Sequence, residues 1–246
     1  MNPPNSVSVC RILCCALCSC ACLNLLAKKD ALFSYSFEEL IGMKVTSVSL
    51  RNESLLETAA SVHVITDEDI RRSGYTDLPN ALRLAPGIHV GMVDEHSYAI
   101  GSRGMNDRFT NKLLVMIDGR SVYTQLFSGT YWDIQDIVME DSERIEVIRG
   151  PGATVYGANA VNVVINIVTK TANNTQGSML STVYASDQKA YLTARHGFRV
   201  SKNTFMNVYG KRSYYRLPNL SGGEPSWNMD QAGFRIDSYK SNSHYT

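Results

Sequence analysis

The segment with the clearest potential for chemistry is a glycine-bearing break at residues 149–152, Arg-Gly-Pro-Gly, which follows an alternating apolar stretch. A glycine-rich turn between a strand and a helix can bind the phosphates of a dinucleotide. Here Val155 occupies the position that needs a third glycine or alanine, and Gly157 would interrupt the helix after one turn. The next apolar run begins near residue 161, too soon for a crossover helix. We therefore reject a nucleotide site.

The histidines and carboxylates form no catalytic or metal-binding pattern. None of the five histidines has the His-x-x-x-His or Glu-x-x-His spacing of a metal site. The one cluster with metal-ligand chemistry, residues 94–96 (Asp-Glu-His), lies in a single polar segment and reads as a solvated loop. A Gly-x-Ser-x-Gly nucleophile turn is missing from the sequence. We expect no metal, no cofactor and no enzyme activity.

The composition is typical of a folded protein with a net charge close to zero. The chain has 246 residues, of which 44% are hydrophobic, enough to bury a core. Its formal net charge of +1 argues against a nucleic-acid partner, which would need a basic surface.

The cysteines mark the N-terminus. All six lie between residues 10 and 22, and five of them lie inside the apolar run 12–26 that follows Arg11. That run is short for a membrane span but suits the hydrophobic region of a signal peptide. A short buried helix is the alternative. We predict that residues 1–27 are a signal peptide, cleaved after Ala21 or Ala27, and that the exported chain has no cysteine.

Two short helices and several strands are expected between residues 61 and 170. Residues 61–65 read as a strand, and Thr66 with Asp69 forms the capping box of a helix that Gly74 ends. A second short helix follows Asp77. Residues 88–103 are expected to form short strands joined by the polar loop 92–97. A strand over 112–117 is followed by the Asp118-Gly119 turn and a return strand over 120–123. Two more strands are expected over 144–148 and over the buried run 161–168.

From about residue 171 the pattern changes to long alternating strands, near 179–184, 190–200, 205–215 and 229–239. In 190–200 one face is apolar (Ala190, Leu192, Ala194, Phe198, Val200) and the other carries polar side chains (Tyr191, Thr193, Arg195, Arg199). Strands of about ten residues with this alternation are typical of outer-membrane β-barrels. An ordinary antiparallel sheet has the same period and stays an alternative.

The order of the glycine-bearing breaks is distinctive. They are Ala85-Pro86-Gly87, Ser102-Arg103-Gly104, Ile117-Asp118-Gly119-Arg120, the segment 143–151 (Glu-Arg-Ile-Glu-Val-Ile-Arg-Gly-Pro), Tyr156-Gly157 and the segment 164–170 (Val-Ile-Asn-Ile-Val-Thr-Lys). Residues 61–170, the plug region, closely resemble the plug domain of TonB-dependent outer-membrane receptors. The match rests on the ordered set over about 110 residues and not on any one tetrapeptide.

The resemblance implies the architecture. We expect an α+β plug, a small mixed sheet with short helices, followed in residues 171–246 by about the first four antiparallel strands of a transmembrane β-barrel. A barrel of about 22 strands needs more than about 200 residues for its strands. Only residues 171–246 follow the plug region, so we expect an N-terminal fragment or truncated product.

The resemblance also implies the function. Such receptors lie in the outer membrane of Gram-negative bacteria, in contact with its lipid, and bind a scarce nutrient. Their most common cargo is a ferric siderophore. The periplasmic protein TonB, driven by the proton gradient of the inner membrane, then pulls on the plug. A soluble periplasmic module that binds a ligand without transporting it is the alternative.

Site residues follow from the same resemblance. Residues 28–60 would be a periplasmic arm, whose segment 44–48 (Lys44, Val45, Thr46, Ser47, Val48) is the candidate TonB contact or, equally, the first plug strand. Arg103 and Arg149 would lock the plug to glutamates of the barrel wall.

Three loops, 92–97, 106–111 and 125–131, would face the cargo. Their candidate contacts are His96, Arg108, Phe109, Gln125, Phe127 and Tyr131. Aromatic rings with an arginine suit a rigid, anionic, partly aromatic chelate. Packing against the barrel wall is the alternative for Phe127 and Tyr131.

Overall fold

The computed structural model describes residues 44–45, 53–54, 61–94, 96–150, 156, 159–184, 190–216, 226–240 and 243–245. All of them belong to one compact unit, Lys44–Thr246. The predicted signal peptide, residues 1–27, and most of the arm lie outside the described residues. Within the described ranges, every helix is too short or too polar to cross a membrane.

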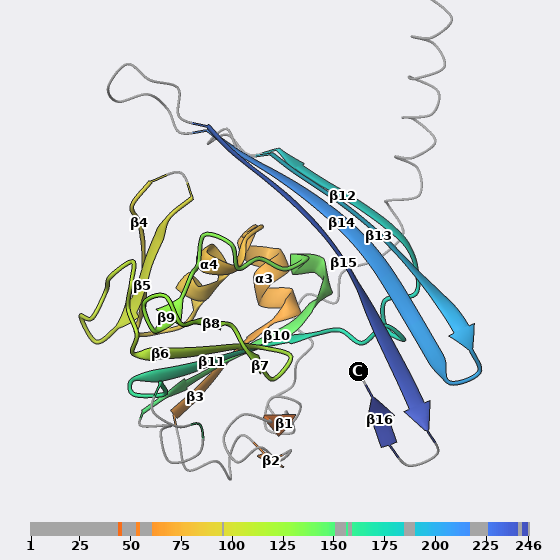
Figure 1. The fold of residues 1–246 in the computed structure, drawn as a ribbon, viewed down its shortest axis with the longest axis horizontal. Helices are drawn as coiled ribbons and strands as arrows, with labels where there is room; N and C mark the ends of the chain where they lie inside the picture. The colour runs from red at the N-terminus through yellow and green to blue at the C-terminus, as the bar shows by residue number, and fades with distance from the viewer. Residues whose placement is uncertain are drawn as a thin grey trace, which may run out of the picture. The chain divides into compact units, whose positions relative to one another are not determined.

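The plug region is built on a mixed five-stranded sheet, as predicted (Figure 1). Its strands, in spatial order, are β3 (Ser61–Thr66), β10 (Ser142–Arg149), β11 (Val163–Thr169), β6 (Leu113–Ile117) and β7 (Arg120–Ser121). The pair β11–β6 is parallel and the other neighbours are antiparallel. Strand β11 is apolar at nearly every position because the central strands are covered on both faces.

Short helices begin where the sequence places their caps. The hydroxyl of Thr66 accepts a hydrogen bond from the backbone N–H of Asp69, whose carboxylate accepts one from the Thr66 N–H, so the capping box of α3 (Asp67–Ser73) is complete. Gly74 ends this helix in the left-handed conformation, with φ 71°. Helix α4 (Leu78–Ala81) starts at the N-cap Asp77 and continues into the 3₁₀ turn η1 (Leu82–Leu84). The helix predictions are therefore confirmed.

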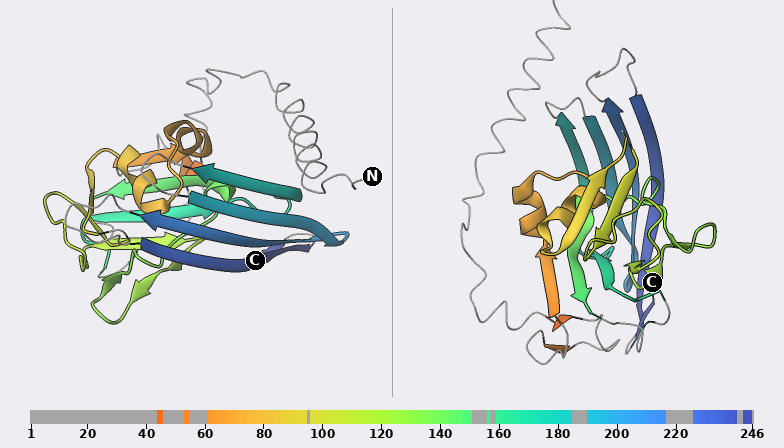
Figure 2. Two further views of the ribbon diagram at one scale, coloured as in Figure 1. Left: turned by 90° about the horizontal axis from the view of Figure 1, so that it is seen from above. Right: turned by 90° about the vertical axis from the view of Figure 1, so that its left-hand side faces the viewer.

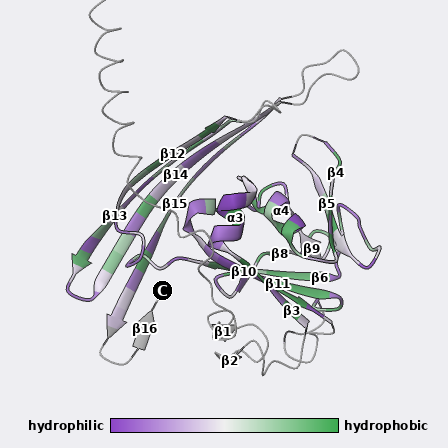
Figure 3. Ribbon diagram, turned by 180° about the vertical axis from the view of Figure 1, so that it is seen from behind, coloured by the Kyte–Doolittle hydropathy of each residue, from purple (hydrophilic) through white to green (hydrophobic). Residues whose placement is uncertain are grey.

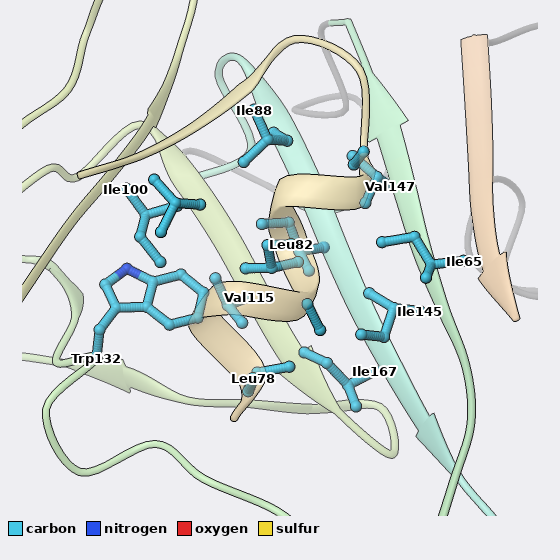
Figure 4. Packing of buried hydrophobic residues seen from close by; sticks show 14 of the residues in the cluster. Ile65, Leu78, Leu82, Ile88, Ile100, Val115, Trp132, Ile145, Val147 and Ile167 are labelled. Carbon is cyan, nitrogen blue, oxygen red and sulfur yellow. The ribbon is translucent and has the colours of Figure 1, made fainter. Parts of the chain in front are cut away.

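The helices cover one face of the mixed sheet and form the main core with it (Figure 4). Leu78 and Leu82 from the helical segment pack with Ile145, Ile165 and Ile167 of the central strands. A second, smaller cluster covers the opposite face, with Leu114, Met116, Ile148, Ala160 and Val164. The plug region thus has an ordinary apolar interior of branched side chains.

Smaller hairpins carry the loops. Strands β4 (Ile88–Met92) and β5 (Tyr98–Ser102) flank the predicted loop, and β8 (Tyr123–Thr124) pairs with β9 (Gly129–Thr130). A 3₁₀ turn, η2 (Met139–Asp141), precedes β10. The return strand expected over 120–123 is wrong in extent, because β7 ends at Ser121 and Tyr123 pairs instead with Thr130.

The C-terminal strands form a separate antiparallel sheet, the long sheet, in sequence order. They are β12 (Gly177–Tyr184), β13 (Ala190–Ser201), β14 (Thr204–Arg216), β15 (Ser226–Lys240) and the short β16 (Ser243–Tyr245). The four predicted long strands are confirmed, and β15 is longer than expected. Figure 2 shows the same strands from two further sides, curving alongside the plug region.

The two faces of the long sheet have opposite environments. Side chains that point away from the plug region are exposed, and many of them are apolar, including Leu192 (50% exposed) and Phe234 (68%), although the ion pair Arg212–Asp230 shares this face. Side chains that point towards it are polar and buried, including Thr193, Lys211 and Asp237. Figure 3 shows this mixture of hydropathy along β12–β15, in contrast to the green strands of the mixed sheet. The sequence predicted two unlike faces, and the structure shows that the polar one is buried.

Candidate functional site

Two of the three candidate cargo loops meet at one buried carboxylate. Arg108 Nη2 lies 2.6 Å from Asp133 Oδ2, and the hydroxyl of Ser97 donates to the same oxygen at 3.3 Å. The Asp133 side chain is only 4% exposed. Because a buried carboxylate needs such partners, Asp133 ties the loops 92–97 and 106–111 together. The sequence offered no reason to select Asp133.

Aromatic contacts join the second loop to the third. The rings of Phe109 and Phe127 meet edge to face with centroids 5.0 Å apart, and Tyr131 lies 6.1 Å from Phe127. The guanidinium carbon of Arg108 lies 5.6 Å from the centroid of the Phe109 ring. Gln125 is exposed, and its side chain makes no hydrogen bond with another described residue. Four of the six candidate cargo residues therefore form one continuous cluster.

His96 lies apart from that cluster and contacts the long sheet. Its ring stacks on Trp227 of β15, with centroids 4.2 Å apart and planes 13° apart, and its Nδ1 lies 3.2 Å from Asp94 Oδ1. Partial burial acts to raise the pKa of Asp94, but hydrogen bonds from His96 and Ser97 outweigh it and leave the pKa below its usual value. Trp227 was not selected from the sequence, because 130 positions separate it from the loop it touches.

The two locking arginines have different surroundings. Arg103 is exposed, adopts φ 57°, and makes no hydrogen bond or ion pair through its side chain within the described part of the chain. Arg149 donates to Ser61 Oγ at 2.9 Å and to the carbonyl of Pro86 at 3.3 Å. Its Nε is buried and finds no partner among the described residues. Their role in locking the plug stays a prediction.

The candidate TonB segment is described only in part. Lys44–Val45 forms β1, which pairs antiparallel with β2 (Glu53–Ser54), whereas 46–48 lies outside the described residues. One backbone edge of β1 is therefore occupied by the chain itself. Its contact with TonB stays a prediction.

A buried ion pair joins the plug region to the long sheet. Lys211 Nζ of β14 lies 2.6 Å from Asp136 Oδ2, and the two side chains are 3% and 5% exposed. The same ammonium donates to the carbonyls of Ile137 at 3.0 Å and Thr76 at 3.3 Å. Burial raises the pKa of the Asp136 carboxyl, although Lys211 beside it acts in the opposite direction. The ammonium therefore makes both of these hydrogen bonds and its ion pair with the plug region.

Two further cations of the long sheet bind plug aspartates. Arg195 of β13 forms an ion pair with Asp141. Arg235 of β15 lies 3.2 Å from Asp118 Oδ2 and 2.9 Å, through its Nε, from Asp237 of its own strand. Asp118 was explained from the sequence by its turn alone; it also serves this contact.

A cavity of ≈ 400 Å³ lies beside these ion pairs, between α3 and the long sheet. From the plug region it is lined by Ile70, Tyr75 and Met139, and from the strands by Ser181, Val183 and Thr193. Among the described residues, no group of three or more His, Cys, Asp or Glu side chains could hold a metal ion.

A small mixed domain packs on the polar face of a strand layer whose other face exposes apolar side chains, an arrangement typical of a plug inside an outer-membrane barrel wall. The family model for the TonB-dependent Receptor Plug Domain matches residues 54–164. Residues 54–164 are therefore a TonB-dependent receptor plug domain.

Known proteins share the sequence and the fold over part of their length. The chain is 30% identical over 145 residues to the vitamin B12 transporter BtuB of Vibrio vulnificus, covering 58% of this chain and 23% of the relative. It is 32% identical over 166 residues to the ferric enterobactin receptor PirA of Pseudomonas aeruginosa, covering 61% and 22%. A crystal structure of the ferric enterobactin receptor PfeA of Pseudomonas aeruginosa shares the fold, with a TM-score of 0.55 at 22% identity, covering 75% and 31%. The chain therefore spans about a quarter of the length of these curated relatives.

Proposed function

We propose that this chain supplies the plug and the first wall strands of an outer-membrane receptor that takes up a scarce nutrient by TonB-dependent, proton-motive-force-driven transport. The two-faced long sheet carries the proposal. Its outward row of Leu180, Leu192, Val208, Phe234 and Ile236 is exposed, and lipid would bury it. A soluble periplasmic module would leave this row in water, which disfavours that alternative.

The proposed layout follows the predicted segments. Residues 1–27 direct export, 28–60 form a periplasmic arm, 61–170 form the plug and 171–246 begin the barrel. The arm offers the segment 44–48 to TonB, by adding a strand to the partner's sheet. Because β1 already pairs with β2, we propose that TonB pairs with the other edge.

A ferric siderophore is the cargo that we favour. The cluster of Phe109, Phe127 and Tyr131 offers aromatic faces for stacking, and Arg108 beside it offers a cation. Asp133 already neutralises part of the Arg108 charge, so the rings supply most of the contact. The relatives named for enterobactin support this class of cargo, and the relative named for vitamin B12 keeps a corrinoid open.

Lipid binding tests the proposal directly. The chain is refolded with vesicles of phosphatidylethanolamine and phosphatidylglycerol and separated by flotation. We expect it to float with the vesicles. Leu192→Arg with Phe234→Arg should return it to the soluble fraction, because each cation added to a lipid-facing position costs up to about 2–4 kcal/mol.

A matched control comes from the same face. Arg212 points outwards on β14 beside Asp230, and both side chains are largely exposed. Arg212→Gln should float as well as the unchanged chain. A chain that stays in the soluble fraction with every vesicle composition would favour the periplasmic module.

TonB binding is a second, independent test. The purified C-terminal domain of TonB should bind the unchanged chain, and Val45→Pro should weaken that binding by removing a backbone donor from β1. Equal binding by the two chains would remove the assignment of the segment 44–48.

A further inference from the structure

The inward face of the long sheet is divided into two sectors. In the anchored sector the cations Arg195, Lys211 and Arg235 of β13–β15 each bind an aspartate of the plug region. In the open sector, β12 and the start of β13 present Ser181, Val183 and Thr193 to the cavity. The two sectors therefore hold the plug by different means.

The anchored sector resists separation because its charges are buried. Pulling Lys211 away from Asp136 leaves an uncompensated charge on either side unless water enters at once. Arg195 and Asp141 are also nearly buried, and Gln231 adds a hydrogen bond to the carbonyl of Asp136 at 3.1 Å. Separation here must break several charged contacts together.

The open sector has no ion pair with the plug region among the described residues. A hydrogen bond from the Tyr191 hydroxyl of β13 to Asp77 Oδ2, at 3.4 Å, lies at its border beside Lys211. Among the described residues, no hydrogen bond or ion pair joins α3 to β12. The charges on the plug side of the cavity are satisfied within the plug region, since Lys170 lies 3.2 Å from Asp67 and donates to the carbonyl of Glu140. Figure 1 shows α3 on the face of the plug region that is turned towards the long strands. Opening this side exposes a cavity that is already present.

We infer that the plug stays anchored to β13–β15 through its three aspartates and separates from the wall first along the cavity between α3 and β12. Lys211, which lines the cavity and binds Asp136, marks the boundary between the two sectors. This inference rests on the proposed function, because a path for cargo would open on the side where the plug separates from the wall when TonB pulls on it.

Two spin-label pairs in the full chain can follow the two sectors separately. With the six cysteines of residues 10–22 replaced by serine, the chain has no other cysteine. Arg71→Cys with Thr182→Cys reports the open sector, and Ile134→Cys with Ala232→Cys reports the anchored one. All four positions are exposed, so the labels displace no core side chain. Distance distributions are measured by pulsed electron spin resonance in detergent micelles at increasing urea.

We expect the width of the Arg71–Thr182 distribution to at least double at a urea concentration that leaves the Ile134–Ala232 width unchanged. Lys211→Met should make the second pair broaden at that concentration too. Arg212→Met is the matched control, one position along the same strand and on the opposite face, and should behave as the unchanged chain.

Simultaneous broadening of both pairs in the unchanged chain would overturn the inference, and so would a narrow Ile134–Ala232 distribution in Lys211→Met. If Lys211→Met does not fold, Asp118→Asn replaces it, because Asp118 is partly exposed and Arg235 keeps Asp237 as its partner. A narrow distribution in that variant overturns the inference equally. The readout needs neither lipid insertion, TonB nor cargo, so it fails or succeeds independently of the proposed function.

Discussion

The interior of the plug region and its contact with the long sheet are both buried, yet they are built from different side chains. Ile145, Ile165 and Leu82 in the interior belong to one cluster of buried apolar side chains. At the contact, Lys211 and Asp136 carry opposite charges. An apolar interior gains stability from burial alone and loses it whenever it opens. A charged contact gains little net stability, but each partner is hydrated after separation. The difference shows that the plug interior depends on apolar packing alone, whereas the contact with the long sheet depends on keeping each buried charge beside its partner.

Removal of one partner of the buried ion pair should have the largest effect on this comparison. Lys211→Ala leaves Asp136 buried without its cation, and we expect a loss of about 3–5 kcal/mol in the free energy of unfolding. Urea titration followed by circular dichroism measures it. The double variant Asp136→Leu with Lys211→Met should recover most of that loss, because it removes both charges. A double variant as unstable as the single one would show that shape, and not charge, makes this contact.

Truncation in the plug interior should have a slightly smaller effect and no rescue. Ile165 is fully buried at the centre of β11, and Ile165→Ala should cost about 2–5 kcal/mol through lost burial and a residual cavity. The same urea titration gives the value. A cost below about 1 kcal/mol would mean that the interior is not the tightly packed layer that the comparison requires.

Loss of the helix cap should have a moderate effect confined to the plug region. Thr66→Ala removes the acceptor for the backbone N–H of Asp69, and we expect a cost of about 0.5–2 kcal/mol. Thr66→Ser keeps the hydroxyl and should retain most of the stability. Equal losses in the two variants would assign the effect to the methyl group of Thr66.

The exposed ion pair on the outer face of the long sheet should have the smallest effect. Arg212 Nε and Asp230 Oδ1 lie 3.5 Å apart, and the side chains are 65% and 69% exposed. Arg212→Ala should change the unfolding free energy by no more than about 1 kcal/mol, and less at high salt. A loss comparable to that of Lys211→Ala would erase the distinction between buried and exposed pairs.

Local features of this fold could be predicted from the sequence because their determinants are neighbours. Thr66 and Asp69 are three positions apart, and the alternation of residues 190–200 sets which side chains share a face. The two-residue alternation along a strand does not show which of its two faces is buried. That choice depends on the plug region, which supplies aspartates to the polar side.

The site could be predicted only in outline for the same reason. The loops carrying Arg108 and Phe127 follow from the resemblance, but Asp133 lies 25 positions from Arg108. Asp118 and Arg235 are 117 positions apart. Spacing along the chain carries no signal for contacts that only the tertiary fold creates.

The side chains of β15 alternate between the two faces of the long sheet, so its contact with the plug region depends on the register in which the strand is paired. Arg235 points inwards between Phe234 and Ile236, which point outwards. A slip of one residue would reverse all three, leaving an apolar side chain opposite Asp118 and the Arg235 guanidinium among the exposed apolar side chains of the outer face. A hairpin paired in the wrong register would lose the contact between Arg235 and Asp118, so the plug aspartates favour the register in which the cations of the strands face them.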